Sequence, residues 1–198
     1  MNIGLTGGIA TGKSTASSLL VQKGALLIDA DAIAREVMLP GQPVLAAVTN
    51  FFGQAILQED GTLDRKKLGN IVFNDKEALK VLNSISHPEI RKQMKERMNE
   101  LEKQNPNTLI VIDIPLLIES GLQSMFEQVL LVYVPRDIQK QRLMLRDSLS
   151  SEQAEARLLT QMDIEEKKFL ADVVIDNSHS LEQTEQQLNE LWLQLGFL

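Results

Sequence analysis

The stretch GLTGGIATGKST, residues 4–15, contains the pattern G-x-x-x-x-G-K-[ST] from Gly7 to Ser14, matched at every fixed position. Glycines allow backbone angles that other residues avoid and bring N–H groups close to phosphate oxygens, and a following helix adds the positive end of its dipole. In such a loop, Lys13 reaches the β- and γ-phosphates and Ser14 binds Mg²⁺ through its hydroxyl. A random chain of this length would show the pattern only about 1% of the time. We therefore expect a nucleoside triphosphate here, contacted by Gly8, Ala10, Thr11, Gly12, Lys13, Ser14 and Thr15.

Short apolar runs alternate with amphipathic helical patterns on both sides of this loop. Such runs are typical of strands covered on both faces in a parallel sheet. The alternation predicts an α/β fold with a five-stranded parallel sheet flanked by helices, whose ligands bind beyond the carboxyl ends of the strands. The predicted strands are 3–6, 25–29, 109–113, 129–134 and 173–176.

Two long helices are predicted outside the strands. One runs from Glu89 to Gln104, with Met94 and Met98 on its apolar face. The other lies near the C-terminus, where helical spacing assigns Trp192 to the core and not to a ligand.

Two acids follow the second predicted strand, in LLIDADAIAR at residues 26–35. In a purely structural interpretation, Asp29 ends the strand and Asp31 caps a helix that begins at Ala32, since Asp is favoured at helix N-caps. In a functional interpretation, the pair lies at the ligand edge, where a carboxylate orients an acceptor hydroxyl and takes its proton. Both interpretations stay open on spacing alone.

Composition excludes several classes of protein. The chain has 198 residues, long enough for a continuous core, and its net charge of −7 repels polyanions such as nucleic acids. It contains no cysteine, which excludes disulfide frameworks and thiolate metal sites. We find no run of transmembrane length and no secretory leader pattern, so we expect a soluble, cytoplasmic protein with no membrane partner. No exposed apolar stripe is distinct from the expected core, so no oligomeric state is assigned.

The rest of the chain favours a small-molecule kinase over other users of this loop. The base-reading stretch of guanine switches and the signature of transporter ATPases are both missing. In PRDIQKQRLMLRDSLS, residues 135–150, Arg142 and Arg146 lie four apart on one face of a predicted helix, as lid arginines that cover a transferred phosphoryl group would. Spacing alone leaves a solvated surface role open.

Two further residues are candidates for the site. Asp113 ends the apolar run TLIVID and is the candidate for holding Mg²⁺, directly or through water. His87 precedes Pro88, and because a lone histidine is usually structural, we expect it to be structural or to line the substrate pocket.

Taken together, these residues resemble the dephospho-coenzyme A kinase family over nearly the whole chain. The phosphate loop is shared by many kinases, but its conjunction with the other stretches is far more specific. These stretches are IDADAIAREV (28–37), GTLDRKKLGNIVF (61–73), HPEIR (87–91), DIPLLIE (113–119), RLMLRD (142–147) and ADVVIDNS (171–178).

The resemblance implies that the γ-phosphoryl group of ATP is transferred, with Mg²⁺, to the ribose 3'-hydroxyl of dephospho-coenzyme A, which gives coenzyme A and ADP as the final step of coenzyme A biosynthesis. It implies Asp31 as catalytic base, Lys13 at the phosphates, Arg142 and Arg146 as lid arginines, and Asn177 near the adenine. The expected acceptor contacts are Thr6, Asp29, Asp31, Arg35, His87, Asp113 and Leu116.

The resemblance also implies a layout of a single kinase unit, 1–198, in three parts. The nucleotide-binding core comprises 1–30, 107–136 and 170–198. A helical acceptor-binding segment covers 31–106, and a lid covers 137–169.

The chain departs from the family's usual pattern at two places. The loop commonly reads Gly-Gly-Ile-Gly-Ser-Gly-Lys, whereas this chain has Ala10 and Thr11. The turn after the last strand commonly reads Asp-Asn-x-Gly, whereas His179 stands here at the glycine position. Two alternatives remain: another nucleoside or nucleotide kinase of this fold, and a non-catalytic nucleotide-binding regulator. The second needs neither Asp31 nor paired lid arginines.

Overall fold

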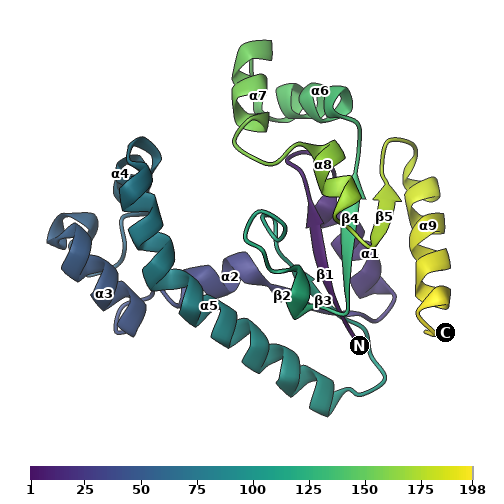
Figure 1. Cartoon of the computed structure of the whole chain (residues 1–198), viewed down its shortest axis with the longest axis horizontal. Helices are drawn as coiled ribbons and strands as arrows, with labels where there is room; N and C mark the ends of the chain where they lie inside the picture. Colours follow the sequence, from purple (N-terminus) through teal and green to yellow (C-terminus); the bar gives the residue numbers. More distant parts are fainter. Residues whose placement is uncertain (198) are drawn as a thin grey trace. The chain divides into compact units, whose positions relative to one another are not determined.

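The predicted parallel sheet is confirmed in a computed structural model that describes residues 1–197. Leu198, the last residue of the predicted nucleotide-binding core, lies outside the described residues. The five strands lie in the order β2-β3-β1-β4-β5, and β1 pairs in parallel with both β3 and β4 (Figure 1). Their bounds are Asn2–Gly7 (β1), Leu26–Asp29 (β2), Ile110–Asp113 (β3), Gln128–Tyr133 (β4) and Val173–Asp176 (β5).

This strand order creates a ligand site beside β1. The chain leaves β1 toward β2 on one side and later reaches β4 on the other side, so the order reverses next to β1. In open α/β sheets, ligands bind beyond the carboxyl ends of the strands at such a reversal. The phosphate loop leaves β1 at this point and leads into α1 (Lys13–Gln22).

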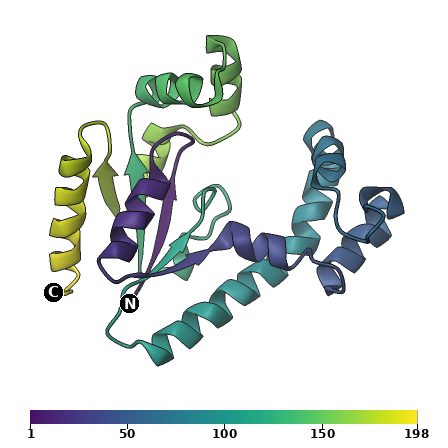
Figure 2. The same ribbon diagram turned by 180° about the vertical axis from the view of Figure 1, so that it is seen from behind.

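Both faces of the sheet are covered. Helices α1 and α9 (Leu181–Gln194) pack on one face (Figure 2), where Ile3, Leu20 and Trp192 belong to one buried apolar cluster. Trp192 is therefore a core residue, as helical spacing predicted. On the other face, α8 (Ile164–Phe169) buries Ile164 against Leu131.

The chain divides into two compact units. The first comprises residues 1–28 and 100–198 and contains the sheet. Besides the helices named above, it contains η2 (Gln123–Met125), α6 (Arg136–Asp147) and α7 (Ser151–Leu158). The second unit comprises residues 29–99 and is helical. Its elements are α2 (Ala30–Glu36), α3 (Pro43–Phe52), η1 (Gln54–Ile56), α4 (Arg65–Asn74) and most of α5 (Lys76–Gln104).

The predicted start of the long helix at Glu89 is wrong. Helix α5 begins at Lys76 and continues through Pro88. Proline lacks an N–H group and crowds the preceding turn, so a helix commonly begins or ends near it. The buried residues Ala78 and Ser86, on the N-terminal side of Pro88, show that packing supports the helix through the break. Within residues 1–197, no helix combines the length and apolar character that a membrane crossing requires.

Candidate active site

The phosphate loop is a tight turn between β1 and α1. Gly12 has φ of 87° and Ala10 has φ of 61°, so two loop residues are left-handed. A side chain at Gly8 would collide with the carboxamide of Gln139, and one at Gly12 would collide with that of Asn177. Glycine is therefore favoured at position 12 both by the backbone angle and by the closeness of Asn177, and at position 8 by the closeness of Gln139 alone.

A cavity of about 650 Å³ opens over this loop. Its volume lies within the usual range for small-molecule sites, roughly 300–1,000 Å³. It brings together all the predicted nucleotide contacts, including Arg142 and Asn177 from distant parts of the chain, and it also contains the predicted lid arginine Arg146. The lining residues are Gly7 to Thr15, Pro115, Arg142, Arg146, Gln161, Asn177 and Leu181.

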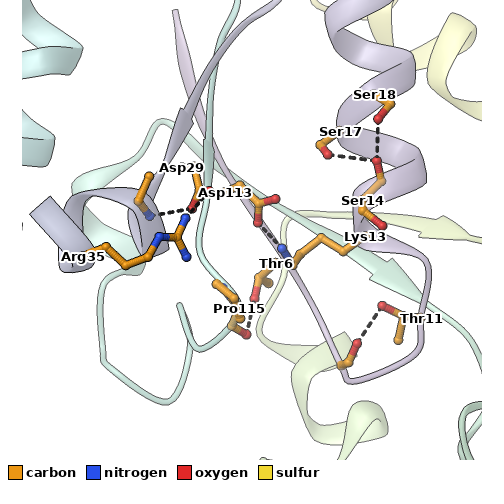
Figure 3. Close-up of polar contacts among 12 residues, drawn as sticks. Thr6, Thr11, Lys13, Ser14, Ser17, Ser18, Asp29, Arg35, Asp113 and Pro115 are labelled. Atoms are coloured by element: carbon orange, nitrogen blue, oxygen red, sulfur yellow. Dashed lines mark hydrogen bonds and ion pairs between the residues drawn. The ribbon is translucent and has the colours of Figure 1, made fainter. Parts of the chain in front are cut away.

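Lys13 and Asp113 form an ion pair at the edge of the sheet (Figure 3). Lys13 is the first residue of α1 and Asp113 the last of β3, and the register pairs Asp113 with Leu5 of the neighbouring β1. Their side chains are only 19% and 15% exposed. The lysine thus lies among the loop residues in a partly desolvated position, where charge interactions are stronger than in water.

The donor set at this edge fits Mg²⁺. Ser14 is exposed at the start of α1, and its backbone carbonyl accepts hydrogen bonds from Ser17 and Ser18 (Figure 3). Its hydroxyl and the Asp113 carboxylate are the hard oxygen donors that Mg²⁺ prefers. No cluster of three or more His, Cys, Asp or Glu side chains occurs among the residues described.

Helix α6 supplies both arginines of the cavity. Arg142 is half-buried, and its Nη2 donates to the backbone carbonyl of Asn177 at 2.8 Å. Arg146 is exposed and donates from Nε to Asp147 at 2.8 Å. Arg157 binds the same carboxylate, and these contacts, with Arg146 as the main cause, lower the pKa of Asp147. Arg136 does not line the cavity and instead pairs with Glu155 and Asp163.

Asn177 is buried at the end of β5 and braces the loop. Its Nδ2 donates to the carbonyl of Thr11 at 2.7 Å, and its Oδ1 accepts from Thr184 at 2.8 Å. His179 is exposed two residues later. The carboxamide is thus engaged by protein on both sides, and its contact with an adenine stays a prediction.

The two acids after β2 have different structural roles. Asp29 is the N-cap of α2 and accepts from the N–H of Ala32 at 3.0 Å, with Arg35 Nη2 at 3.4 Å from its other oxygen (Figure 3). The prediction that Asp31 caps a helix from Ala32 is therefore wrong: α2 begins at Ala30, a strong helix former, directly after Asp29. Asp31 is exposed in the first turn of α2.

The remaining predicted acceptor residues lie in three environments. Thr6 is fully buried and donates to the carbonyl of Pro115 at 3.1 Å, whereas the neighbouring Leu116 is 42% exposed. His87 is half-buried in the helical unit and lines a cavity of about 310 Å³ with Ser86 and Ile90. Burial, and secondly the charge of Arg91, lowers the pKa of His87 from its ordinary value.

Sequence reasoning missed two glutamines at the loop. Gln139 Nε2 donates to the carbonyl of Ile9 at 2.8 Å, and the N–H of Ile9 donates to Gln161 Oε1 at 2.9 Å. A glutamine belongs to no phosphate-loop pattern, and these contacts span more than a hundred residues of chain. No local signal could have indicated them.

Comparisons with known proteins agree with this geometry. A family model described as dephospho-CoA kinase matches residues 1–183. The dephospho-CoA kinase of Carboxydothermus hydrogenoformans is 50% identical over 94% of this chain and 90% of its own length. That of Shouchella clausii is 48% identical over 95% of both chains.

Solved structures give the same result. The dephospho-CoA kinase from Campylobacter jejuni superposes with a TM-score of 0.76 at 36% identity, covering 98% of this chain and 96% of that one. A shikimate kinase from Acinetobacter baumannii has a TM-score of 0.54 at 17% identity, covering 98% of this chain and 93% of its own, and so shares the fold alone.

Proposed function

The chain belongs to the dephospho-CoA kinase family, and from this premise we propose that it transfers the γ-phosphoryl group of ATP to the ribose 3'-hydroxyl of dephospho-CoA. The products are coenzyme A and ADP, as in the final step of coenzyme A biosynthesis. The observation that carries the proposal is the cavity in which the phosphate loop, Lys13 and two arginines of α6 meet.

On the donor side, the loop N–H groups and Lys13 bind the phosphates of ATP. Ser14 and Asp113 would hold Mg²⁺, which would neutralise negative charge on the phosphates of ATP. The ion pair between Lys13 and Asp113 supports this assignment, because it keeps both charged groups beside the loop. Asn177 lies near the adenine.

On the acceptor side, Asp31 is the proposed base. It takes the proton of the 3'-hydroxyl while that oxygen bonds to the γ-phosphorus and the bond to the bridging oxygen of ADP breaks. Asp29, and not Asp31, caps α2, so the carboxylate of Asp31 is not used as a helix cap, which supports this role. Asp29 and Arg35 orient the segment that carries Asp31, and they contact the acceptor together with Thr6, His87, Asp113 and Leu116.

Arg142 and Arg146 complete the proposed machinery. Each guanidinium group can donate two parallel hydrogen bonds to phosphate oxygens and can stabilise the charge of the transferred group. They belong to the proposed lid, residues 137–169, which excludes water so that ATP is not hydrolysed. We place this reaction in the cytoplasm, with no nucleic-acid or membrane partner.

An acceptor panel tests the proposal. ADP release is measured with ATP, Mg²⁺ and, in turn, dephospho-CoA, adenosine, AMP, uridine and shikimate. We expect acceptor-dependent release with dephospho-CoA far above that with the others. Release that depends on another acceptor instead would assign the chain to a different kinase activity, and the absence of any acceptor-dependent release would indicate a nucleotide-binding regulator.

A further inference from the structure

Ile9, in the middle of the phosphate loop, has both of its backbone polar groups bound by glutamine side chains. Gln161 accepts from its N–H at 2.9 Å, and Gln139 donates to its carbonyl at 2.8 Å. Gln139 belongs to α6 and is only 3% exposed, while Gln161 follows α7. Two separate parts of the proposed lid therefore hold one residue of the loop.

The next residue, Ala10, has a backbone conformation that alanine rarely adopts. Its φ of 61° lies in the left-handed region, where Cβ crowds the following carbonyl. Such a residue persists only where its surroundings fix the backbone on both sides. The glutamines fix it on the side of Ile9. On the other side, Asn177 donates to the Thr11 carbonyl at 2.7 Å, and the Thr11 hydroxyl donates to the Gly8 carbonyl at 2.9 Å.

The side chains of the loop point to the same coupling. Ile9 and Ala10 pack against an apolar cluster formed by Leu143 of α6 with Ala154 and Leu158 of α7. The loop is thus joined to α6 and α7 by packing and to the two glutamines by hydrogen bonds. Both glutamines contact the loop, although neither belongs to the phosphate-binding pattern.

We propose that Gln139 and Gln161 are positioning residues that act through Ile9 to hold Ala10 in the left-handed conformation that phosphate binding requires. The proposal rests on the proposed ATP site. Glycine adopts this conformation without steric cost, so a loop with glycine at position 10 depends less on the glutamines. In this chain, the two hydrogen bonds to Ile9 stabilise the left-handed conformation at position 10 that a glycine would adopt without them.

The test is a double-mutant cycle on MgATP affinity, measured by titration calorimetry with the full chain. The four proteins are the parent, Gln161→Met, Ala10→Gly and the double variant. Methionine keeps the length of Gln161 but removes the acceptor that binds Ile9. We expect Gln161→Met to raise Kd about tenfold, the effect of one lost hydrogen bond that orders the site. In the Ala10→Gly background we expect a rise of at most about threefold, because the loop no longer needs support. Ala10→Gly and the double variant both lack the Ala10 methyl group. Any effect of its packing on Kd therefore cancels when these two proteins are compared.

The test compares the rise in Kd that Gln161→Met causes in the parent with the rise that it causes in the Ala10→Gly background, as a ratio. A ratio above about two supports the proposal, since residues that act together show coupling of at least this size. A ratio of about two or less overturns it. The same cycle with Gln139→Met gives an independent second measurement. If the parent itself does not bind MgATP, the proposed function fails; if it binds and the cycle is additive, only the positioning role fails.

Two controls separate positioning from general damage. Gln141→Met alters an exposed glutamine on α6, the helix that carries Gln139, and should leave the Kd of MgATP unchanged. The KM for dephospho-CoA in Gln161→Met should stay within about twofold of the parent, because the lost bond lies on the donor side. An equal rise of this KM and the ATP Kd would contradict the proposed role.

Discussion

Lys13 and Asp113 form an ion pair between the first residue of α1 and the last residue of β3. Because β1 and β3 are neighbouring parallel strands, their carboxyl ends bring the lysine that we propose binds phosphate beside the carboxylate that we propose binds the metal. The pair satisfies two partly buried charges before nucleotide binds. In the proposed function, phosphate would replace Asp113 as the partner of Lys13, and Mg²⁺ would replace Lys13 as the partner of Asp113, each with a charge of the same sign.

Replacing Lys13 with methionine should abolish most of the turnover. The side chain keeps its length but loses the charge that stabilises the transferred phosphoryl group. We expect kcat to fall by roughly 100- to 1,000-fold, the cost of removing one preorganised donor. Steady-state ADP release measures the effect, with circular dichroism as the check that the variant is folded. A variant that keeps more than about a tenth of the parent's kcat would show that Lys13 does not contact the reacting phosphate.

Asp31→Asn should separate chemistry from binding. We expect a loss of turnover of at least about 100-fold, the lower range for a positioned general base. The Kd of MgATP should be nearly unchanged, because Asp31 serves the acceptor. Stopped-flow turnover and calorimetry on one preparation give both values. Unaltered turnover would show that the base is another residue.

Asp29→Ala should instead affect stability, because Asp29 caps α2. Loss of the hydrogen bond to the N–H of Ala32 should lower the free energy of unfolding by about 1 kcal/mol. Asp31→Ala is the matched comparison and should have a much smaller effect in the same urea titration. Equal losses in the two variants would contradict the capping assignment.

Arg142 and Arg146 should act on turnover and not on folding. Arg142→Ala and Arg146→Ala should each lower kcat by at least about 100-fold, since an arginine that stabilises a transferred phosphoryl group contributes this much or more. Arg136→Ala is the control on the same helix: it loses ion pairs with Glu155 and Asp163 and should lower the melting temperature. If Arg136→Ala reduced kcat as strongly as the other two, the three arginines would share one structural role.

His87 should make stability depend on pH below neutrality. Its folded-state pKa is lowered by burial, so the unfolded chain binds the proton more readily. Well above pH 6.5, His87 is unprotonated in both states, so its protonation does not change the free energy of unfolding. This free energy should fall as the pH drops below 6.5, because the unfolded chain then binds the proton first. Urea titrations of the parent and of His87→Gln at pH 7.5 and pH 5.5 test this. The variant should lose less stability on acidification than the parent, and an equal loss would assign the effect to other groups.

The fold and the position of the phosphate loop between β1 and α1 could be predicted because they depend on local patterns. The apolar runs indicated where the strands lie, and the spacing from Gly7 to Ser14 indicated where the loop lies. The start of α5 was missed because packing around Ala78 and Ser86 overrides the local effect of Pro88. The cap of α2 was missed by two residues because either acid satisfies the same preference. The contacts of Gln139 and Gln161 arise only in the folded chain, so no sequence pattern indicates them.

The central claim is that the chain phosphorylates the ribose 3'-hydroxyl of dephospho-CoA. Phosphorus NMR of a completed reaction with ATP, Mg²⁺ and dephospho-CoA tests it most directly. The account predicts ADP and a new 3'-phosphomonoester in equal amounts, with no accumulation of inorganic phosphate. Inorganic phosphate in place of the phosphomonoester, or a phosphate at another hydroxyl, would contradict it.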